Sequence, residues 1–201
     1  MYRFLKRVFD ILFSLAWLIG FSPLLLIVAI LVRIKLGSPI FFIQERPGKD
    51  GKPFRMVKFR TMTDEKDSSG NLLSDEIRLT KFGRFLRSTT LDEFPEMWNV
   101  LIGDMSVVGP RPLMMRYLPR YNKFQARRME MKPGVTGWAQ INGRNAISWG
   151  EKFAFDVWYI DNSSFWLDLK IVVKTFFVVL NRRNINSSKA ATMEEFEGYT
   201  K

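Results

Sequence analysis

The chain contains no cysteine and no histidine. The lack of cysteine excludes disulfide bonds, thiol nucleophiles and cysteine-ligated metals, and agrees with a reducing compartment. Without histidine, acid–base or nucleophilic chemistry must use carboxylates, lysine, tyrosine or hydroxyl groups. Any bound metal would be a hard cation held by oxygen ligands, most simply Mg²⁺.

Acidic residues are few: 20 against 31 lysines and arginines, which gives a formal net charge of +11. This charge favours an anionic partner, either nucleic acid, lipid headgroups or a phosphorylated substrate. A basic binding module without chemistry is one interpretation, since net charge alone permits it. The basic regions lack the interleaved aromatic residues of a single-strand platform, so we expect no nucleic-acid partner.

Charge is absent altogether from residues 11–32, a run of 22 residues. As a helix this run would be about 33 Å long, enough to cross the hydrocarbon core of a bilayer. The proline at its middle removes a backbone hydrogen bond that lipid cannot replace. Basic residues flank the run on both sides: Arg3, Lys6 and Arg7 before it, and Arg33 and Lys35 after it.

Because positive charge is retained in the cytoplasm, two basic flanks favour a helix that enters the membrane, breaks at Ser22-Pro23 and returns to the same face. The Ser22 hydroxyl would cap a backbone group freed at the break. The alternative is a single span with a proline kink. The run is too long for a typical signal peptide, and no small-x-small cleavage site follows it. We predict a re-entrant helix-break-helix over residues 1–36 and a cytoplasmic catalytic domain with interfacial helices over residues 37–201.

The remaining pattern predicts an α/β fold that is rich in α-helix and has a small sheet. Residues 38–48, "SPIFFIQERPG", predict a short buried strand with a turn at Pro47-Gly48. Residues 52–62, "KPFRMVKFRTM", predict a second strand with Lys58 and Arg60 on one face. The polar stretch 63–76 is expected to be a loop, either a lid or an ordinary surface loop.

Two helices are expected next. The first is basic and carries Leu79, Phe82, Phe85 and Leu86 at helical spacing, although Gly83 weakens the pattern. The second runs from about 91 to 102 and ends at Gly103. Because Pro95 is tolerated only near a first turn, Asp92 and Glu93 are expected close to the N-terminus of this helix.

These two adjacent acids have a local explanation, because Thr90 and Glu93 match a capping box and acids complement the helix dipole. Three features favour catalysis instead: Arg84 and Arg87 upstream, the absence of histidine and cysteine, and the turn "GPRP" at 109–112. An aspartate beside arginines stays ionised and can attack phosphorus. Nearby arginines can hold the diphosphate that is cleaved.

The C-terminal half is less specific. Residues 131–149 predict a loop that presents backbone amides, with Arg144 near its end. Residues 151–164 predict a helix with Phe153, Val157 and Ile160 on its core face and its acids on the surface. Residues 165–183 predict an apolar-rich helix interrupted by three charges, which is either interfacial, packed beneath the membrane segment, or a core helix.

Several segments together resemble a known family. They are the Ser-Pro-broken helix, "KFRTM", "RSTTLDEFPEMWNVLIGDMSVVGPRP", "KPGVTGWAQINGRN" and "FDVWYIDNSSFWLDLKI". In this order and spacing they resemble the bacterial sugar transferases, the monotopic phosphoglycosyl transferases, over essentially the whole chain. The segment "GRNAISW" is similar to the PglC type, which handles UDP-N,N'-diacetylbacillosamine.

The resemblance implies transfer of a phospho-sugar from a UDP-sugar to polyprenol (undecaprenyl) phosphate, with release of UMP. This reaction is the first membrane step of glycoconjugate biosynthesis, such as protein glycosylation or surface glycan assembly. The implied location is the cytoplasmic face of the bacterial inner membrane, through a re-entrant helix bound to phospholipid. Another UDP-hexose or UDP-N-acetylhexosamine donor is the alternative, and the sequence does not indicate an oligomeric state.

The resemblance also implies roles for individual residues. Asp92 would attack the β-phosphate and form an aspartyl phospho-sugar intermediate, so that catalysis is ping-pong. Glu93 would position Mg²⁺, shared with Asp92, or assist proton removal. A direct attack by the lipid phosphate, with the two acids only binding Mg²⁺, is the rival mechanism. The implied contacts to phosphate and nucleotide are Lys58, Arg87, Arg111 and Arg144, with Pro110 and Pro112 stiffening a turn near the uridine.

Overall fold

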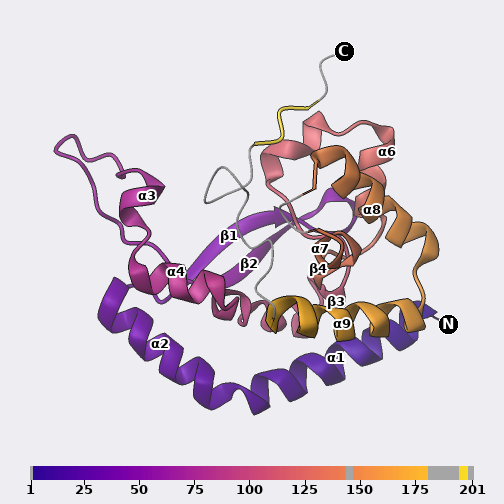
Figure 1. Ribbon diagram of the computed structural model, residues 1–201, viewed down its shortest axis with the longest axis horizontal. Coiled ribbons are helices and arrows are strands. Elements are labelled where there is room, and N and C mark those ends of the chain that lie inside the picture. The colour runs from indigo at the N-terminus through magenta and orange to yellow at the C-terminus, as the bar shows by residue number, and fades with distance from the viewer. Residues whose placement is uncertain (1, 144–146, 181–194, 199–201) are drawn as a thin grey trace.

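The computed structural model describes residues 2–143, 147–180 and 195–198 (Figure 1). In chain order the α-helices are α1 (Tyr2–Gly20), α2 (Ser22–Leu36), α3 (Asp75–Arg78), α4 (Lys81–Ser88), α5 (Glu96–Ile102), α6 (Lys123–Ala126), α7 (Trp138–Ile141), α8 (Trp149–Asn162) and α9 (Phe165–Leu180). The strands are β1 (Phe41–Pro47), β2 (Pro53–Phe59), β3 (Ser106–Val108) and β4 (Gly134–Thr136). The 3-10 helices are η1 (Lys49–Gly51), η2 (Leu91–Glu93), η3 (Met115–Arg120) and η4 (Arg127–Glu130). The α-rich character is confirmed.

The predicted break in the apolar run is confirmed. Helices α1 and α2 are bent by 63° at Phe21, and Pro23 lies in the first turn of α2, where its missing N–H costs no helical bond. The Ser22 hydroxyl donates to the carbonyl of Ile19 at 2.8 Å, which caps a group freed at the break. Within the described ranges no single helix has the length and hydropathy to cross a bilayer, and α1 with α2 meets that criterion only as a bent pair.

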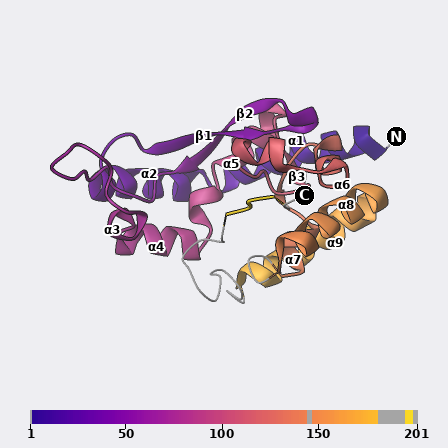
Figure 2. The ribbon, with the colours of Figure 1, turned by 90° about the horizontal axis from the view of Figure 1, so that it is seen from above.

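The strands form two separate two-stranded sheets instead of one small sheet. Strands β1 and β2 pair antiparallel, from Phe41 opposite Phe59 to Pro47 opposite Pro53, as the two predicted strands require. Strands β3 and β4 pair parallel. The prediction that β1 is buried was wrong, because Phe41, Phe42 and Ile43 are 43–51% exposed. A continuous apolar run is typical of a strand that is covered on both faces, which is why the sequence predicts burial. In the structure the β1–β2 hairpin lies along one side of the molecule (Figure 2).

The predicted helix from 91 to 102 is interrupted. Thr90 has a positive φ of 58°, residues Leu91–Glu93 form the 3-10 helix η2, and Pro95 is the N-cap of α5. Gly103 ends α5 in the left-handed conformation, as expected. The preceding helix α4 is capped by Thr80, whose hydroxyl accepts from the Gly83 amide. A Cβ at Gly83 would lie 1.8 Å from the carbonyl oxygen of Thr61, so glycine here lets α4 approach the end of β2.

The main core lies between α1, α5, β2, β3 and α9. Its buried members are Phe54, Met56, Met97, Val100, Met105, Val107, Val108, Tyr159 and Ile171. A second cluster joins α2 to α4 and β2 through Val28, Val32, Leu36, Phe59 and Leu86. Both legs of the bent pair therefore pack against the same body. The predicted division at residue 36 stays a prediction.

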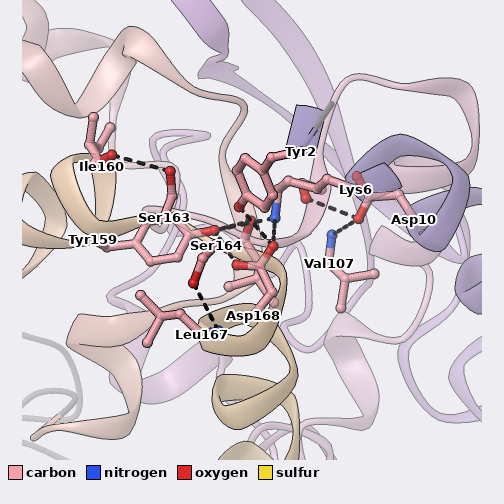
Figure 3. Close-up of polar contacts among 12 residues, drawn as sticks. Tyr2, Lys6, Asp10, Val107, Tyr159, Ile160, Ser163, Ser164, Leu167 and Asp168 are labelled. Atoms are coloured by element: carbon pink, nitrogen blue, oxygen red, sulfur yellow. Dashed lines mark hydrogen bonds and ion pairs between the residues drawn. The ribbon is translucent and has the colours of Figure 1, made fainter. Parts of the chain in front are cut away.

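A polar network fixes the start of α1 (Figure 3). Lys6 forms a buried ion pair with Asp168 of α9 at 2.7 Å, and the hydroxyl of Tyr159 donates to the same carboxylate at 2.6 Å. Asp10 accepts from the Val107 amide and the Ser106 hydroxyl at 2.9 and 3.0 Å. Lys6 and Asp168 are thus paired and Asp10 is hydrogen-bonded, as the burial of charged groups requires. Lys6 is thus committed to the protein instead of lying free beside the apolar run.

The C-terminal half contains more structure than the sequence indicated. Residues 131–149, predicted as a loop, contain β4 and α7. Helix α8 is confirmed, with Phe153 and Val157 buried and Ile160 partly buried. The prediction that its acids lie on the surface was wrong for Asp156, which is buried and paired with Arg128 at 2.7 Å. Because the partner comes from a distant 3-10 helix, the local sequence does not show it.

Candidate active site

Asp92 and Glu93 lie on η2, in the short connection between α4 and α5. The local capping explanation is not what the structure contains. Thr90 makes no side-chain cap, and the Glu93 carboxylate bonds to residues from other parts of the chain. The two acids are therefore presented by a turn, and long-range contacts decide their chemistry.

Glu93 is bound by two cations. The ammonium of Lys58 on β2 donates to Oε1 at 2.7 Å, and the guanidinium of Arg111 donates to both carboxylate oxygens, with 3.3 Å from Nη1 to Oε2. Burial by itself raises the pKa of Glu93, but the charges and hydrogen bonds of Arg111 and Lys58 hold it well below its usual range. Glu93 is thus a stable carboxylate and a weak base.

Glu96 completes this cluster from the first turn of α5. It is 1% exposed and lies 3.0 Å from the ammonium of Lys58. Burial raises the pKa of Glu96, which Lys58 opposes. Burial alone would lower the pKa of Lys58, but Glu93 and Glu96 raise it above its ordinary value, so the ammonium stays charged. The sequence analysis did not identify Glu96, although it follows Glu93 by three residues at the start of a helix.

Asp92 differs from its neighbour. It is 8% exposed, and within the described residues its carboxylate has no hydrogen bond or ion pair. Burial raises the pKa of Asp92 to about 6, and the negative charge of Glu93 adds to the rise, against the opposing charges of Lys58 and Arg87. Burial thus outweighs the nearby arginines in setting this pKa. At neutral pH the group is still mostly ionised, with its lone pairs uncommitted.

The cations upstream of the pair have different surroundings. Arg87 donates from Nε to the Thr61 hydroxyl at 3.1 Å, and its charge acts on Asp92. Arg84 donates to the carbonyl of Leu79 at 2.8 Å, at the start of its own helix. Of these two arginines, Arg87 is the one whose charge acts on Asp92.

The turn "GPRP" is braced from behind. The carbonyl of Pro110 accepts from the Gly134 amide at 3.0 Å, and the carbonyl of Arg111 accepts from the guanidinium of Arg128 at 2.6 Å. A Cβ at Gly134 would lie 2.0 Å from the Gly109 nitrogen, so the close approach of these two backbones requires glycine. This bracing directs the Arg111 side chain at Glu93.

The structure brings most of the predicted site residues together. Lys58, Arg87 and Arg111 surround the two acids, and Pro110 and Pro112 flank Arg111 in the adjoining wall. Arg144 lies outside the described residues. The break between α1 and α2 is also nearby, since the rings of Trp17 and Phe21 lie 4.9 and 5.5 Å from that of Phe94, the residue after Glu93.

The same residues can be tested as a Mg²⁺ site. No cluster of three or more acidic, histidine or cysteine side chains suited to a metal occurs in the ranges that the structure covers. Mg²⁺ is commonly held by one or two carboxylates, with substrate phosphates and water completing its ligands. The free oxygens of Asp92 suit that arrangement, and Glu93 is its only adjacent carboxylate on η2. Asp92 fits Mg²⁺ that arrives with a phosphorylated substrate, whereas both carboxylate oxygens of Glu93 are already engaged by Lys58 and Arg111.

Comparison with known proteins gives a consistent picture. The model of the family described as bacterial sugar transferase matches residues 1–182. The chain is 58% identical over 194 residues to "Uncharacterized sugar transferase EpsL" of Bacillus subtilis (strain 168), and the match covers 96% of each chain.

Two further relatives are longer. The UDP-glucose:undecaprenyl-phosphate glucose-1-phosphate transferase of Klebsiella pneumoniae is 44% identical over 182 residues, which cover 86% of this chain and 39% of the relative. The UDP-N-acetylgalactosamine-undecaprenyl-phosphate N-acetylgalactosaminephosphotransferase of Aeromonas hydrophila is 36% identical over 187 residues, which cover 89% of this chain and 44% of the relative. The chain thus spans about two fifths of the length of these two relatives.

Proposed function

Because the chain belongs to the bacterial sugar transferase family, we propose that it transfers a sugar phosphate from a UDP-sugar to undecaprenyl phosphate, giving undecaprenyl diphosphate sugar and UMP. The names of the relatives from K. pneumoniae and A. hydrophila support this reaction class. The observation that carries the proposal is the carboxylate of Asp92, which is nearly buried, uncommitted and surrounded by cations.

The reaction proceeds in two halves. A carboxylate oxygen of Asp92 attacks the β-phosphorus of the donor, and the bond from this phosphorus to the oxygen bridging the two phosphates breaks. UMP leaves with the electron pair of that bond, and the phospho-sugar remains on Asp92 as an acyl phosphate. An oxygen of undecaprenyl phosphate then attacks the same phosphorus, and the carboxylate of Asp92 is restored.

The cations stabilise the negative charge on the transferred phosphoryl group. Lys58, Arg87 and Arg111 come from three separate segments and are already in place, so little reorganisation is needed during the reaction. The low pKa of Glu93 supports a role in orienting Lys58 and Arg111 over one in removing a proton. Of the two predicted metal ligands, Asp92 would hold Mg²⁺, which when bound neutralises charge on the diphosphate, while Glu93 beside it is engaged by Lys58 and Arg111.

A membrane location is supported by the inverted pattern of α1. The buried residues of this helix are polar, namely Lys6, Asp10 and Ser14 at intervals of four, whereas a helix in water buries its apolar side. Its exposed large apolar side chains are Phe4, Leu5, Val8, Ile11, Leu12, Leu15 and Ile19, and those of α2 are Leu26, Ile27, Ile30 and Ile34. A soluble monomer rarely exposes so continuous an apolar surface. We propose that the bent pair lies in the cytoplasmic leaflet of the bacterial inner membrane as a re-entrant helix.

The donor sugar is a finer proposal. The segment "GRNAISW" favours UDP-N,N'-diacetylbacillosamine, although its residues 144–146 lie outside the described ranges. The relatives are named for glucose, galactose and N-acetylgalactosamine donors. UDP-glucose, UDP-galactose and UDP-N-acetylgalactosamine are therefore the alternatives to compare.

The test uses the full chain in nanodiscs with Mg²⁺ and a panel of these UDP-sugars. Without undecaprenyl phosphate, UMP release from the preferred donor is expected to stop near one equivalent per enzyme, and adding the acceptor starts turnover. Asp92→Asn should abolish both signals while the melting temperature is kept. Asp50→Asn, an exposed acid in η1, is the control and should behave as the wild type.

Three outcomes contradict parts of the proposal. Turnover by Asp92→Asn at the wild-type rate removes Asp92 from its role. Turnover without any UMP release in the absence of acceptor favours direct attack by the lipid phosphate. A folded wild-type protein that releases no UMP from any donor in the panel contradicts the proposed reaction.

A further inference from the structure

A cavity of about 100 Å³ lies between the β1–β2 hairpin, the first turn of α5 and the turn at 109–112. This volume is below that of a typical ligand pocket, so the cavity accommodates a part of a nucleotide sugar and not the whole molecule. Its walls contain three cations and one carboxylate. The lining residues are Arg46, Met56, Lys58, Glu96, Arg111, Pro112 and Leu113.

Two of the three cations already have carboxylate partners. Lys58 is paired with Glu93 and Glu96, and Arg111 is paired with Glu93. Arg46 has no carboxylate within 4.0 Å among residues 2–143, 147–180 and 195–198. One positive charge of the cavity is therefore not neutralised by a direct ion pair.

The hydrogen bonds of Arg46 are also incomplete. Its Nη2 donates to the amide oxygen of Gln44 at 2.6 Å, which orients the guanidinium. Its Nε is buried and has no acceptor in the part of the chain that the structure describes. Burial lowers the pKa of Arg46, and the charge of Arg111 adds to this effect. A bound anion would stabilise the guanidinium in these surroundings, because it supplies both a negative charge and oxygen atoms that accept hydrogen bonds.

The strand register explains why Arg46 joins this cluster. Residues directly opposite in an antiparallel pair share a face, and side chains alternate along each strand. Phe42 is opposite Lys58, and Arg46 is opposite Phe54, so Arg46 and Lys58 are on the same face of the hairpin. The two cations are four positions apart along that face, one at each end of it.

We infer that Arg46 binds a phosphate of the nucleotide diphosphate donor, namely the one that departs in the nucleotide. This inference rests on the proposed function. The transferred phosphorus must lie beside Asp92, where Lys58 and Arg111 are close, so Arg46 is placed for the next phosphate along. A guanidinium matches phosphate oxygens in a bidentate fork, which suits Arg46 to this role.

The acceptor also carries a phosphate, and the position of Arg46 favours the donor over it. Strand β1 begins near the end of α2 and runs away from the α1–α2 pair toward α6 and α8 (Figure 1). Arg46 is the second-last residue of this strand, so it lies at the end remote from the apolar helices. A water-soluble diphosphate reaches this end more directly than a lipid phosphate does.

The first experiment measures binding of UDP to the full chain in nanodiscs. Arg46→Gln is expected to weaken UDP binding by roughly 10- to 150-fold, which corresponds to the loss of charged hydrogen bonds. The UDP affinity of Arg46→Lys should lie between those of the wild type and Arg46→Gln, because lysine keeps the charge but lacks the two-pronged guanidinium. Arg55→Gln is the control: Arg55 is exposed and opposite Glu45, on the other face of the same hairpin. The Arg55→Gln variant should bind UDP with the affinity of the wild type.

The second experiment separates the two sources of phosphate. Arg46→Gln should raise the KM for the UDP-sugar by a similar factor and leave the KM for undecaprenyl phosphate unchanged. Unaltered UDP binding by a folded Arg46→Gln variant overturns the inference, and so does a rise confined to the KM of the acceptor. If the wild type releases no UMP from any donor while Arg46→Gln still weakens UDP binding, the proposed reaction fails and the phosphate site stands.

Discussion

Replacing Asp156 with asparagine is expected to destabilise the protein strongly, because it leaves Arg128 charged and buried without its carboxylate. The two side chains are 3% and 2% exposed, and Arg128 donates from Nη2 and Nε to the same carboxylate oxygen at 2.7 and 3.0 Å. Arg128 also donates to the carbonyl of Arg111, so the pair connects α8 to the turn that carries Arg111.

Removing one partner of a buried ion pair costs about 3–5 kcal/mol. Asparagine keeps the volume and one acceptor oxygen, which places Asp156→Asn near the lower limit, at about 3 kcal/mol. For a chain of this size each kcal/mol lowers the melting temperature by about 2–4 °C, so we expect a decrease of roughly 6–12 °C. Thermal unfolding in detergent, followed by circular dichroism, measures it.

The same helix offers a matched control. Asp161 is paired with Arg127 on the surface, where their side chains are 49% and 37% exposed, and surface pairs contribute little. Asp161→Asn should therefore melt close to the wild type. A double variant, Asp156→Leu with Arg128→Met, should recover part of the lost stability, because it removes both buried charges. If Asp156→Asn melts as high as Asp161→Asn, the reasoning about the buried charge is refuted.

Three other perturbations test separate features. Gly83→Ala should lower stability because its Cβ would meet the Thr61 carbonyl oxygen, whereas Gly20→Ala, with nothing within 4 Å, should not; equal melting temperatures would contradict the close packing of α4. Asp92 must be ionised to attack, and burial raises its pKa to about 6, so the rate of UMP release should fall as the pH is lowered through about 6. A rate that stays constant down to pH 5 would argue against Asp92 as the nucleophile. Replacing Ser22 with Ala and Pro23 with Leu should straighten the bent pair and export an N-terminal tag, and an exported tag in the unmodified protein would contradict the re-entrant arrangement.

Features that depend on neighbouring residues were predictable from the sequence. The break at Ser22-Pro23 follows from one proline in an apolar run, and the hairpin follows from two apolar segments around a turn. The position of Asp92 and Glu93 near the start of a helix follows from Pro95. In each case the physical cause acts within a few residues, so the local pattern is sufficient.

Features that depend on distant partners were not predictable. Glu93 was recognised as an acid, but its commitment to Lys58 and Arg111 decides that Asp92 is the uncommitted carboxylate. Asp156 belongs to an amphipathic pattern that favours the surface, and only its pairing with Arg128 makes burial possible. Arg46 has a signal in the sequence, since it alternates in phase with the expected hairpin, but it is recognisable only once the register with Lys58 is known.

The pairing of Lys6 with Asp168 also has a consequence for the order of events during synthesis. The two residues are 162 positions apart, and the Val107 amide that donates to Asp10 lies 97 positions after it in the chain. At bacterial and eukaryotic elongation rates of about 5–20 residues per second, roughly 8–32 s separate the emergence of Lys6 from that of its carboxylate. Helix α1 leaves the ribosome well before its polar partners, so until they emerge its charges must be satisfied by water or lipid headgroups.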